Sequence, residues 1–172
     1  VPSLRTFLCA GAPIPGPLVE QARKALGAKI VSAWGTTENG AVTPTRLEDD
    51  DERSFNTDGC PLPGVEIKVV DVDGQPLPPG EPGKLLLRSC SNFGGYLHRA
   101  HLNATDADDW FDTGDLARID ERGYLRITGR SKDVIIRGGE NIPVVEVESL
   151  LYRHPANAMA AIVAYPDERL GE

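Results

Sequence analysis

Several features are scarce in this sequence, and each scarcity argues against a class of protein. The three cysteines, Cys9, Cys60 and Cys90, are odd in number and show no CxxC spacing, so reduced thiols are expected rather than a disulfide framework. His98 and His101 are spaced as a metal pair, but no third or fourth ligand lies near them, which argues against a metal centre. No apolar run reaches the roughly 20 residues that a bilayer crossing requires.

Basic charge is also in short supply. The 172 residues carry 18 lysines and arginines against 26 aspartates and glutamates, a formal net charge of −8, which argues against nucleic acid or an anionic membrane as the main partner. Acidic clusters at residues 48–52 and 106–112 are interpreted as solvated loops. The remaining composition, 40% hydrophobic and 26% charged, is typical of a soluble cytoplasmic α/β protein.

The first part of the chain predicts a strand, a helix and a second strand. A buried strand is expected over residues 5–10, a helix over 17–26 and a strand over 29–33. This order implies two parallel strands joined by a right-handed crossover, with ligand-binding loops at their carboxyl ends. Residues 11–13 (GAP) and 34–38 (WGTTE) both fall at that edge, which points to a site there.

Beyond residue 58 the pattern changes to short alternating runs. VEIKVVD, GKLLLRS, LARID and YLRIT are separated by glycine and proline turns, which predicts a small antiparallel sheet or barrel. A strand over 134–136, a helix over 144–152 and a final strand over 160–165 would then begin a small α+β domain. The predicted fold class is mixed α/β and β. Its three parts are residues 1–57, the α/β portion; 58–131, the antiparallel portion; and 132–172, the start of the C-terminal domain.

An isolated aspartate and an isolated arginine flank the last hairpin of the antiparallel region. The hairpin turns at residues 121–123, so Asp115 and Arg130 should return to the same end of the sheet. A carboxylate there can accept two hydrogen bonds from a vicinal diol, and a guanidinium can donate to the same oxygens. The pair is therefore either a ribose clamp or an ordinary exposed ion pair beside a hairpin.

Motifs along nearly the whole chain resemble the adenylate-forming superfamily, which includes acyl-CoA synthetases, the adenylation domains of nonribosomal peptide synthetases and firefly luciferase. Residues 110–148 resemble its TGD…GR-x-K-D…GGEN-x-x-x-x-E-x-E region, residues 34–38 its aromatic-Gly-x-Thr-Glu motif and residues 11–13 its Gly-Ala-x-Pro segment. Weaker matches are residues 59–64, 83–85 and 95–96. Their shared order and spacing make the set specific.

The resemblance implies a site for ATP or AMP. The implied nucleotide-binding residues are Gly11, Ala12, Pro13, Trp34, Gly35, Thr36, Thr37, Asp115, Ile127 and Arg130. Trp34 stands where the family usually has tyrosine and would stack on adenine; the alternative is a core aromatic at a strand end. Gly35 would let the backbone approach the ligand closely. Residues 11–13 would line the purine through their backbone, and Ile127 would pack on adenosine.

The catalytic residues implied by the resemblance are Thr37, Glu38, Arg130 and Lys132. Thr37 would contact the α-phosphate and Glu38 would bind Mg²⁺; alternatively, Thr-Thr-Glu caps a helix. Lys132 would be the hinge between two half-reactions, or else an exposed linker lysine. Gly138, Gly139 and Glu140 would face the coenzyme A thiol, or form a plain turn between strand and helix.

The implied activity is that of an ATP-dependent acyl-CoA synthetase acting on a carboxylic acid, ATP and coenzyme A. The alternatives are an adenylation domain that loads a carrier-protein thiol and an inactive, binding-only homologue. The family's phosphate loop is expected upstream of Val1 and its C-terminal lysine downstream of Glu172, so the sequence is interpreted as an internal piece that is inactive by itself. The acyl group and the oligomeric state are not encoded in these motifs.

Overall fold

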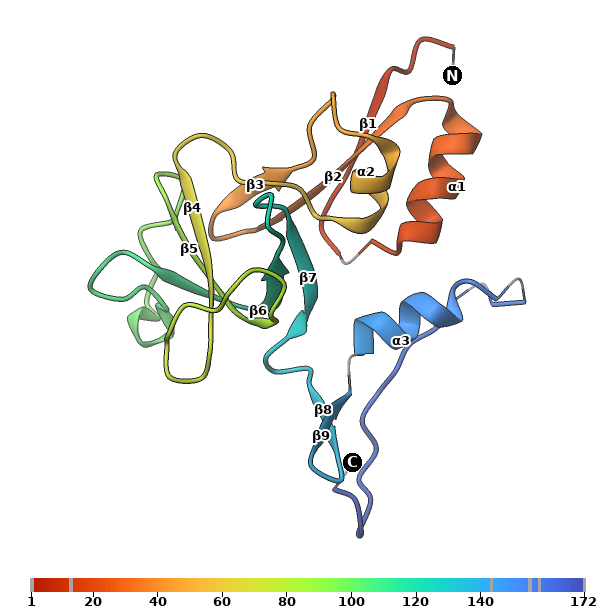
Figure 1. The fold of residues 1–172 in the computed structure, drawn as a ribbon. Helices are drawn as coiled ribbons and strands as arrows, with labels where there is room; N and C mark the ends of the chain where they lie inside the picture. Colours follow the sequence, from red (N-terminus) through yellow and green to blue (C-terminus); the bar gives the residue numbers. More distant parts are fainter. Residues whose placement is uncertain (1, 13, 143, 155, 158, 172) are drawn as a thin grey trace.

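The computed structural model describes residues 2–12, 14–142, 144–154, 156–157 and 159–171. Three sheets make up the fold, with strand orders β1-β2-β3, β4-β5-β6-β7 and β8-β9 (Figure 1). The predicted mixed α/β and β class is therefore confirmed. Of the two forms expected for the antiparallel region, the open sheet is the one found, because β4 and β7 lie at opposite edges and do not pair.

The first sheet contains the predicted parallel crossover. Strand β1 (Thr6–Cys9) pairs in parallel with β2 (Lys29–Thr36), and α1 (Gly16–Leu26) connects them. The helix ends at Gly27, whose φ of 62° is a left-handed conformation that glycine adopts without strain. A third strand, β3 (Gly40–Pro44), pairs antiparallel with β2 and was not predicted.

The prediction that the first strand is buried is wrong. In β1, Phe7 is 44% exposed and Leu8 is 57% exposed. Among the described residues β1 pairs only with β2, so it is an edge strand without neighbours on its outer side. An apolar run of this length does not distinguish a central strand from an edge strand.

The acidic cluster at residues 48–52 is only in part a solvated loop: residues 48–50 lie in a largely exposed turn, and helix α2 (Asp51–Asn56) begins directly after them. The Asp50 side chain caps the helix by accepting a hydrogen bond from the Arg53 backbone N–H at 2.9 Å. Asp51 and Glu52 lie in the first turn, where negative charge is favourable. In the second acidic cluster, residues 106–109 form an exposed turn, as interpreted from the sequence, and β6 begins soon after it at Phe111.

The second sheet is a four-stranded antiparallel meander. Its strands are β4 (Val65–Val70), β5 (Gly83–Ser89), β6 (Phe111–Ile119) and β7 (Leu125–Arg130), with the short 3-10 helix η1 (Ala100–Leu102) before β6. Its buried side chains, including Leu85, Leu87 and Leu125, form one apolar cluster with Trp34 and Val42 of the first sheet. The two sheets therefore share a core, and Trp34 lies at their junction.

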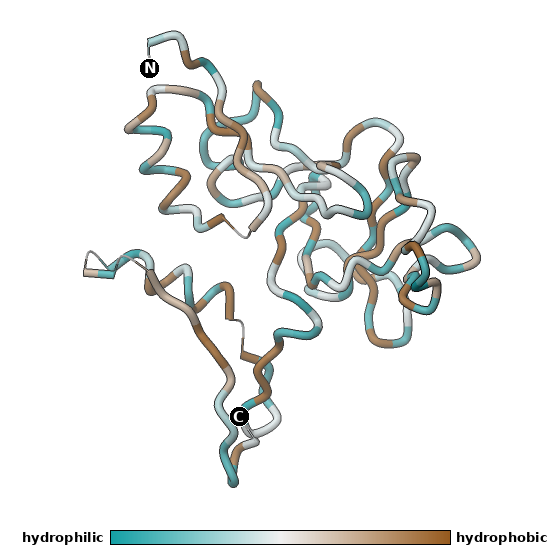
Figure 2. The backbone as a smooth tube through the Cα atoms, turned by 180° about the vertical axis from the view of Figure 1, so that it is seen from behind, coloured by the Kyte–Doolittle hydropathy of each residue, from teal (hydrophilic) through white to brown (hydrophobic). Residues whose placement is uncertain are grey.

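The C-terminal part extends away from this core (Figure 1). It consists of a hairpin, β8 (Ile135–Arg137) and β9 (Glu140–Ile142), followed by α3 (Val144–Leu151). The predicted strand and helix are confirmed here to within a residue, but the strand expected over 160–165 is absent. The Ile162 N–H donates to the Glu148 carboxylate of α3 at 2.8 Å, so this apolar segment lies against the helix and not along a sheet edge (Figure 2). In the described part of the chain, no helix is both long and apolar enough to traverse a bilayer.

Candidate functional site

A cavity of about 720 Å³ opens where the carboxyl end of β2, the β6–β7 pair and α3 approach one another. Many of the residues expected to bind the nucleotide line it. They are Gly11, Ala12, Trp34, Gly35, Thr36, Asp115, Ile127 and Arg130, with Lys132 at the same cavity. Residues of two different sheets thus meet at this cavity, whereas the strand–helix–strand pattern indicated only that residues 11–13 and 34–38 share an edge. Pro13 lies outside the described residues.

The predicted convergence of Asp115 and Arg130 is confirmed. The two residues are cross-strand partners in β6 and β7, and Arg130 Nε donates to Asp115 Oδ1 at 3.0 Å. Their exposures differ sharply: the Asp115 side chain is 4% exposed and that of Arg130 is 65% exposed. The pair is therefore not an ordinary surface ion pair, because its carboxylate is buried at the cavity while its guanidinium reaches solvent.

Trp34 makes a contact that the motif did not reveal. Its indole Nε1 donates to Asp115 Oδ2 at 2.8 Å, across a separation of 81 residues in the sequence. Trp34 is 9% exposed and belongs to the shared apolar cluster, which confirms the core-aromatic alternative. Trp34 also borders the cavity, so the stacking on adenine stays a prediction. This hydrogen bond has no local signal in the sequence, because it depends on how strands distant in the sequence come together.

Gly35 is required by the backbone itself, and the close approach of a ligand there stays a prediction. The β2–β3 register shifts between Trp34 and Gly35, and a Cβ at position 35 would lie 1.9 Å from the Gly40 carbonyl oxygen. The glycine therefore permits the bulge that turns β2 against β3. Gly11 has a φ of 97°, a backbone conformation that favours glycine, in the loop after β1.

The Thr-Thr-Glu segment forms the turn between β2 and β3, so the helix-cap alternative is wrong. Neither Thr37 nor Glu38 lines the cavity. The Tyr96 hydroxyl donates to Glu38 Oε1 at 2.6 Å, and the Phe93 N–H donates to the Glu38 carbonyl at 2.7 Å. The hydrogen bond from Tyr96, followed by that from Thr36, lowers the pKa of Glu38 below its ordinary value. The turn thus presents a carboxylate that stays ionised.

Asp58 belongs to the cavity but was not singled out from the sequence. It is 6% exposed, accepts the Ile127 N–H at 2.8 Å and lies 3.5 Å from Arg126 Nη1. Burial raises its pKa, and Arg126 opposes that shift. Asp58 therefore fixes β7 beside the cavity wall that Ile127 supplies. The only sequence signal was its place directly before the Gly59 motif.

The residues assigned to the hinge and to the coenzyme A side lie at different places. Lys132 is exposed in the turn that follows β7. Gly138 and Gly139 have φ values of 60° and 89° and form the tip of the β8–β9 hairpin, so they are not a turn between strand and helix. Gly138, Gly139 and Glu140 do not line the cavity in this conformation.

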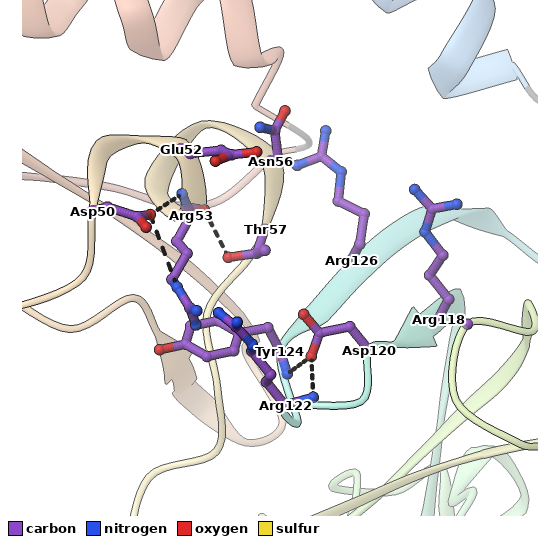
Figure 3. A pocket seen from close by; sticks show the side chains of 11 residues that line it. Asp50, Glu52, Arg53, Asn56, Thr57, Arg118, Asp120, Arg122, Tyr124 and Arg126 are labelled. Carbon is purple, nitrogen blue, oxygen red and sulfur yellow. Dashed lines mark hydrogen bonds and ion pairs between the residues drawn. The ribbon is translucent and has the colours of Figure 1, made fainter.

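A second, smaller pocket of about 480 Å³ lies between α2 and the β6–β7 hairpin (Figure 3). Arg118 and Arg126 face one another across the two strands, and the Arg53 guanidinium stacks 4.6 Å from the centroid of the Tyr124 ring. Asp120 accepts hydrogen bonds from backbone N–H groups of the hairpin turn at 2.9 and 2.8 Å. The arginines in this lining therefore lie among carboxylates.

The architecture is that of the adenylate-forming enzymes, and this chain belongs to the AMP-binding enzyme family, whose model matches residues 1–97. It is similar to the medium-chain fatty-acid–CoA ligase of Escherichia coli, with 45% identity over 99% of this chain and 30% of that protein. It is 40% identical to enterobactin synthase component E of the same organism, over 99% of this chain and 32% of that protein. The ATP-bound MatB structure from Rhodopseudomonas palustris superposes with a TM-score of 0.88 at 31% identity, covering 96% of this chain and 33% of that one. The chain thus spans about a third of the length of these relatives.

Proposed function

We propose that this chain supplies the adenosine-binding part of an AMP-forming acyl-CoA synthetase. In the proposed reaction a carboxylate oxygen attacks the α-phosphate of ATP and pyrophosphate leaves. A thiol sulfur, as coenzyme A, then attacks the acyl carbon and AMP leaves, which gives a thioester. The observation that carries this proposal is the buried Asp115 carboxylate paired with Arg130 at the cavity.

The Asp115–Arg130 pair suits a ribose. A carboxylate offers about four lone-pair sites, of which two are used by Trp34 and Arg130, so two remain for a vicinal diol. Arg130 retains donors for the ribose or a phosphate because its planar guanidinium carries five N–H groups. Ile127 and the backbone of Gly11 and Ala12 would complete the adenosine site.

Glu38 suits a hard cation that accompanies ATP. Its carboxylate is ionised and held by Tyr96, and within the described residues no group of three or more potential ligands surrounds it. Mg²⁺ in phosphate-transfer sites is commonly bound by one or two carboxylates, phosphate oxygens and waters. When bound, it would neutralise phosphate charge. Thr37, exposed in the same turn, would donate its hydroxyl to the α-phosphate.

The division of labour along the chain is also part of the proposal. Residues 1–57 and 58–131 would hold the nucleotide, and residues 132–172 would reorient about Lys132 between the half-reactions. Such a movement would bring Gly138, Gly139 and Glu140 towards the thiol, where two glycines permit close approach of a pantetheine arm.

A carrier-protein thiol is the second candidate acceptor. The similarity to enterobactin synthase component E, at 40% identity, is the observation that favours it. The two candidates share the adenylation step and differ only in the thiol that attacks.

The decisive experiment uses the complete natural protein that carries this sequence. Pyrophosphate release is measured across a panel of carboxylic acids, and thioester formation is then measured with coenzyme A and with a phosphopantetheinylated carrier protein. Acid-dependent pyrophosphate release together with acyl-CoA formation supports the synthetase. Transfer to the carrier protein alone supports the second candidate, and nucleotide binding without pyrophosphate release would indicate a binding-only homologue.

A further inference from the structure

Both oxygens of the Asp115 carboxylate are held by the protein. Oδ1 accepts from Arg130 Nε at 3.0 Å, and Oδ2 accepts from Trp34 Nε1 at 2.8 Å. With an exposed fraction of 4%, this side chain has little water to orient it. Its rotation about χ2 is therefore set by these two donors, which bind different oxygens of the carboxylate.

The two donors differ in how firmly they are fixed. The Arg130 side chain is 65% exposed and has many rotatable bonds, so its guanidinium can follow a ligand. Trp34 is 9% exposed and packs in the cluster that contains Val42 and Leu85, and close-packed aromatic rings have little freedom. The indole N–H is thus the rigid donor of the pair.

The β2–β3 bulge supports this rigidity. The register shift lies directly between Trp34 and Gly35, and no side chain fits at Gly35. A bulge re-aims the side chain beside it. Here the bulge lies next to Trp34, whose indole N–H is oriented towards Asp115 in β6.

We infer that Trp34 is a positioning residue for ribose recognition: its indole N–H holds the Asp115 carboxylate so that the remaining lone pairs meet both hydroxyls of a bound ribose. This inference rests on the proposed function and adds a specificity role to it. Trp34 then contributes to selection of ribonucleotides over deoxyribonucleotides, separately from any stacking of its ring on adenine.

The test compares AMP with 2′,3′-dideoxy-AMP by isothermal titration calorimetry in the complete natural protein. Trp34→Phe keeps an aromatic face but removes the N–H. The ratio of the dissociation constant for dideoxy-AMP to that for AMP measures recognition of the hydroxyls. In Trp34→Phe this ratio should fall about tenfold, near the lower end for loss of one hydrogen bond to a charged group. The matched control is Trp110→Phe, because Trp110 lies between Lys68 and Arg88 on the other sheet and outside the cavity. Its ratio should equal that of the unmodified protein.

The outcomes separate three cases. If the unmodified protein binds AMP and dideoxy-AMP equally, the ribose clamp itself is wrong, and the proposed function loses its main support. If the unmodified protein discriminates and Trp34→Phe discriminates equally, the positioning role is wrong. If Trp34→Phe lowered the affinity for AMP and for dideoxy-AMP by the same factor, the positioning role would also be wrong. Loss of stacking or a less ordered site would lower both affinities without regard to the hydroxyls.

A second substitution covers the case in which Trp34→Phe does not fold, because phenylalanine leaves a cavity in the core. Replacing Trp34 with benzothienylalanine exchanges the N–H for sulfur and keeps the size and shape of the ring. The same fall in the ratio of dissociation constants is expected, and an unchanged ratio would overturn the inference.

Discussion

The junction between the two larger sheets and the C-terminal part of the chain differ in how they are held. At the junction Trp34 and Asp115 are almost completely buried and hydrogen-bonded to each other. In the C-terminal part, α3 has no buried residue among those described, and Met159, Val163 and Tyr165 are each more than three-quarters exposed. The junction is thus held by burial and a side-chain hydrogen bond, whereas the segment after β7 is attached by few buried contacts.

This contrast suits a site that holds one ligand while its surroundings change. Preorganised groups lose little conformational freedom on binding, so burial of the proposed ribose clamp would favour affinity. A weakly buried segment costs little to detach and reorient. The single turn at residues 131–133 connects the two, and Lys132 lies in the middle of it.

The largest expected effect is that of Lys132→Pro, which would restrict the connection without touching the junction. Proline holds φ at about −65°, so the variant should favour one orientation of the C-terminal part and block the other. We expect one half-reaction to survive and the other to fall at least about 100-fold, equivalent to about 2.7 kcal/mol of activation free energy. The retained step should be acyl-adenylate formation. The two half-reactions are measured separately.

The control is Lys132→Ala, which removes the ammonium group but leaves the backbone free. It should leave both steps near their original rates. Equal losses in both half-reactions of Lys132→Pro would indicate an active-site role or misfolding, and no loss in either would make Lys132 an ordinary linker residue.

The second-largest effect is expected from a substitution in the buried junction. In Asp115→Asn an amide NH₂ must face one of the two donors, Trp34 or Arg130, so a buried hydrogen bond is lost. AMP affinity should fall about 100-fold and the free energy of unfolding by about 2 kcal/mol, as expected for a buried, charge-assisted pair. Calorimetry and urea denaturation measure the two quantities. Asp108→Asn, at a surface position, should change neither; a stable Asp115→Asn variant with unaltered AMP affinity would rule out the clamp.

The same contrast explains what could be predicted from the sequence. The β6–β7 hairpin and the meeting of Asp115 with Arg130 followed from local turn geometry, which determines the register of a hairpin. The Trp34–Asp115 hydrogen bond joins residues of different sheets and has no local signal. The exposure of β1 and the absence of a strand over 160–165 were missed for a related reason, because an apolar run does not reveal whether a neighbouring strand is present.

Helix α2 was not predicted although the sequence contains a signal for its first turn. Asp50 followed by Asp51 and Glu52 is a typical helix start, but the same residues fit a solvated acidic loop. For Thr36–Glu38 the resemblance identified the residues, whereas only the structure established a β-turn in place of a helix cap. The identity of these residues therefore did not determine which backbone element carries them.

A smaller effect is expected at the edge of the junction, in Glu38→Gln. An amide oxygen is a weaker ligand for a hard cation than a carboxylate, so the Mg²⁺ concentration for half-maximal adenylation should rise about tenfold, or about 1.4 kcal/mol. Binding of AMP measured without Mg²⁺ should not change. Glu48→Gln, at an exposed position, is the control. Unchanged Mg²⁺ dependence in Glu38→Gln would show that Glu38 does not contact the cation.

The smallest effect is expected from Tyr96→Phe, which leaves Glu38 in place but removes the hydroxyl that holds it. The Tyr96 hydrogen bond is the main cause that lowers the pKa of Glu38, so this pKa should rise towards its ordinary value in the variant. A carboxylate with a lowered folded-state pKa stabilises the fold above its unfolded pKa, and this contribution disappears as the pH falls through the folded-state pKa. The variant should therefore be slightly less stable than the original protein at pH 7, and the difference should narrow in acid.

Adenylation should slow by no more than about fivefold, the upper end for an exposed charged contact. Urea denaturation between acid pH and pH 7 measures the stability difference, a carboxyl carbon NMR titration measures the Glu38 pKa, and pyrophosphate release measures adenylation. Tyr165→Phe is the control because Tyr165 is 80% exposed. An unchanged Glu38 pKa in Tyr96→Phe would mean that the turn orients the carboxylate without help from Tyr96. The rigid region would then extend from the buried junction along β2 into this turn.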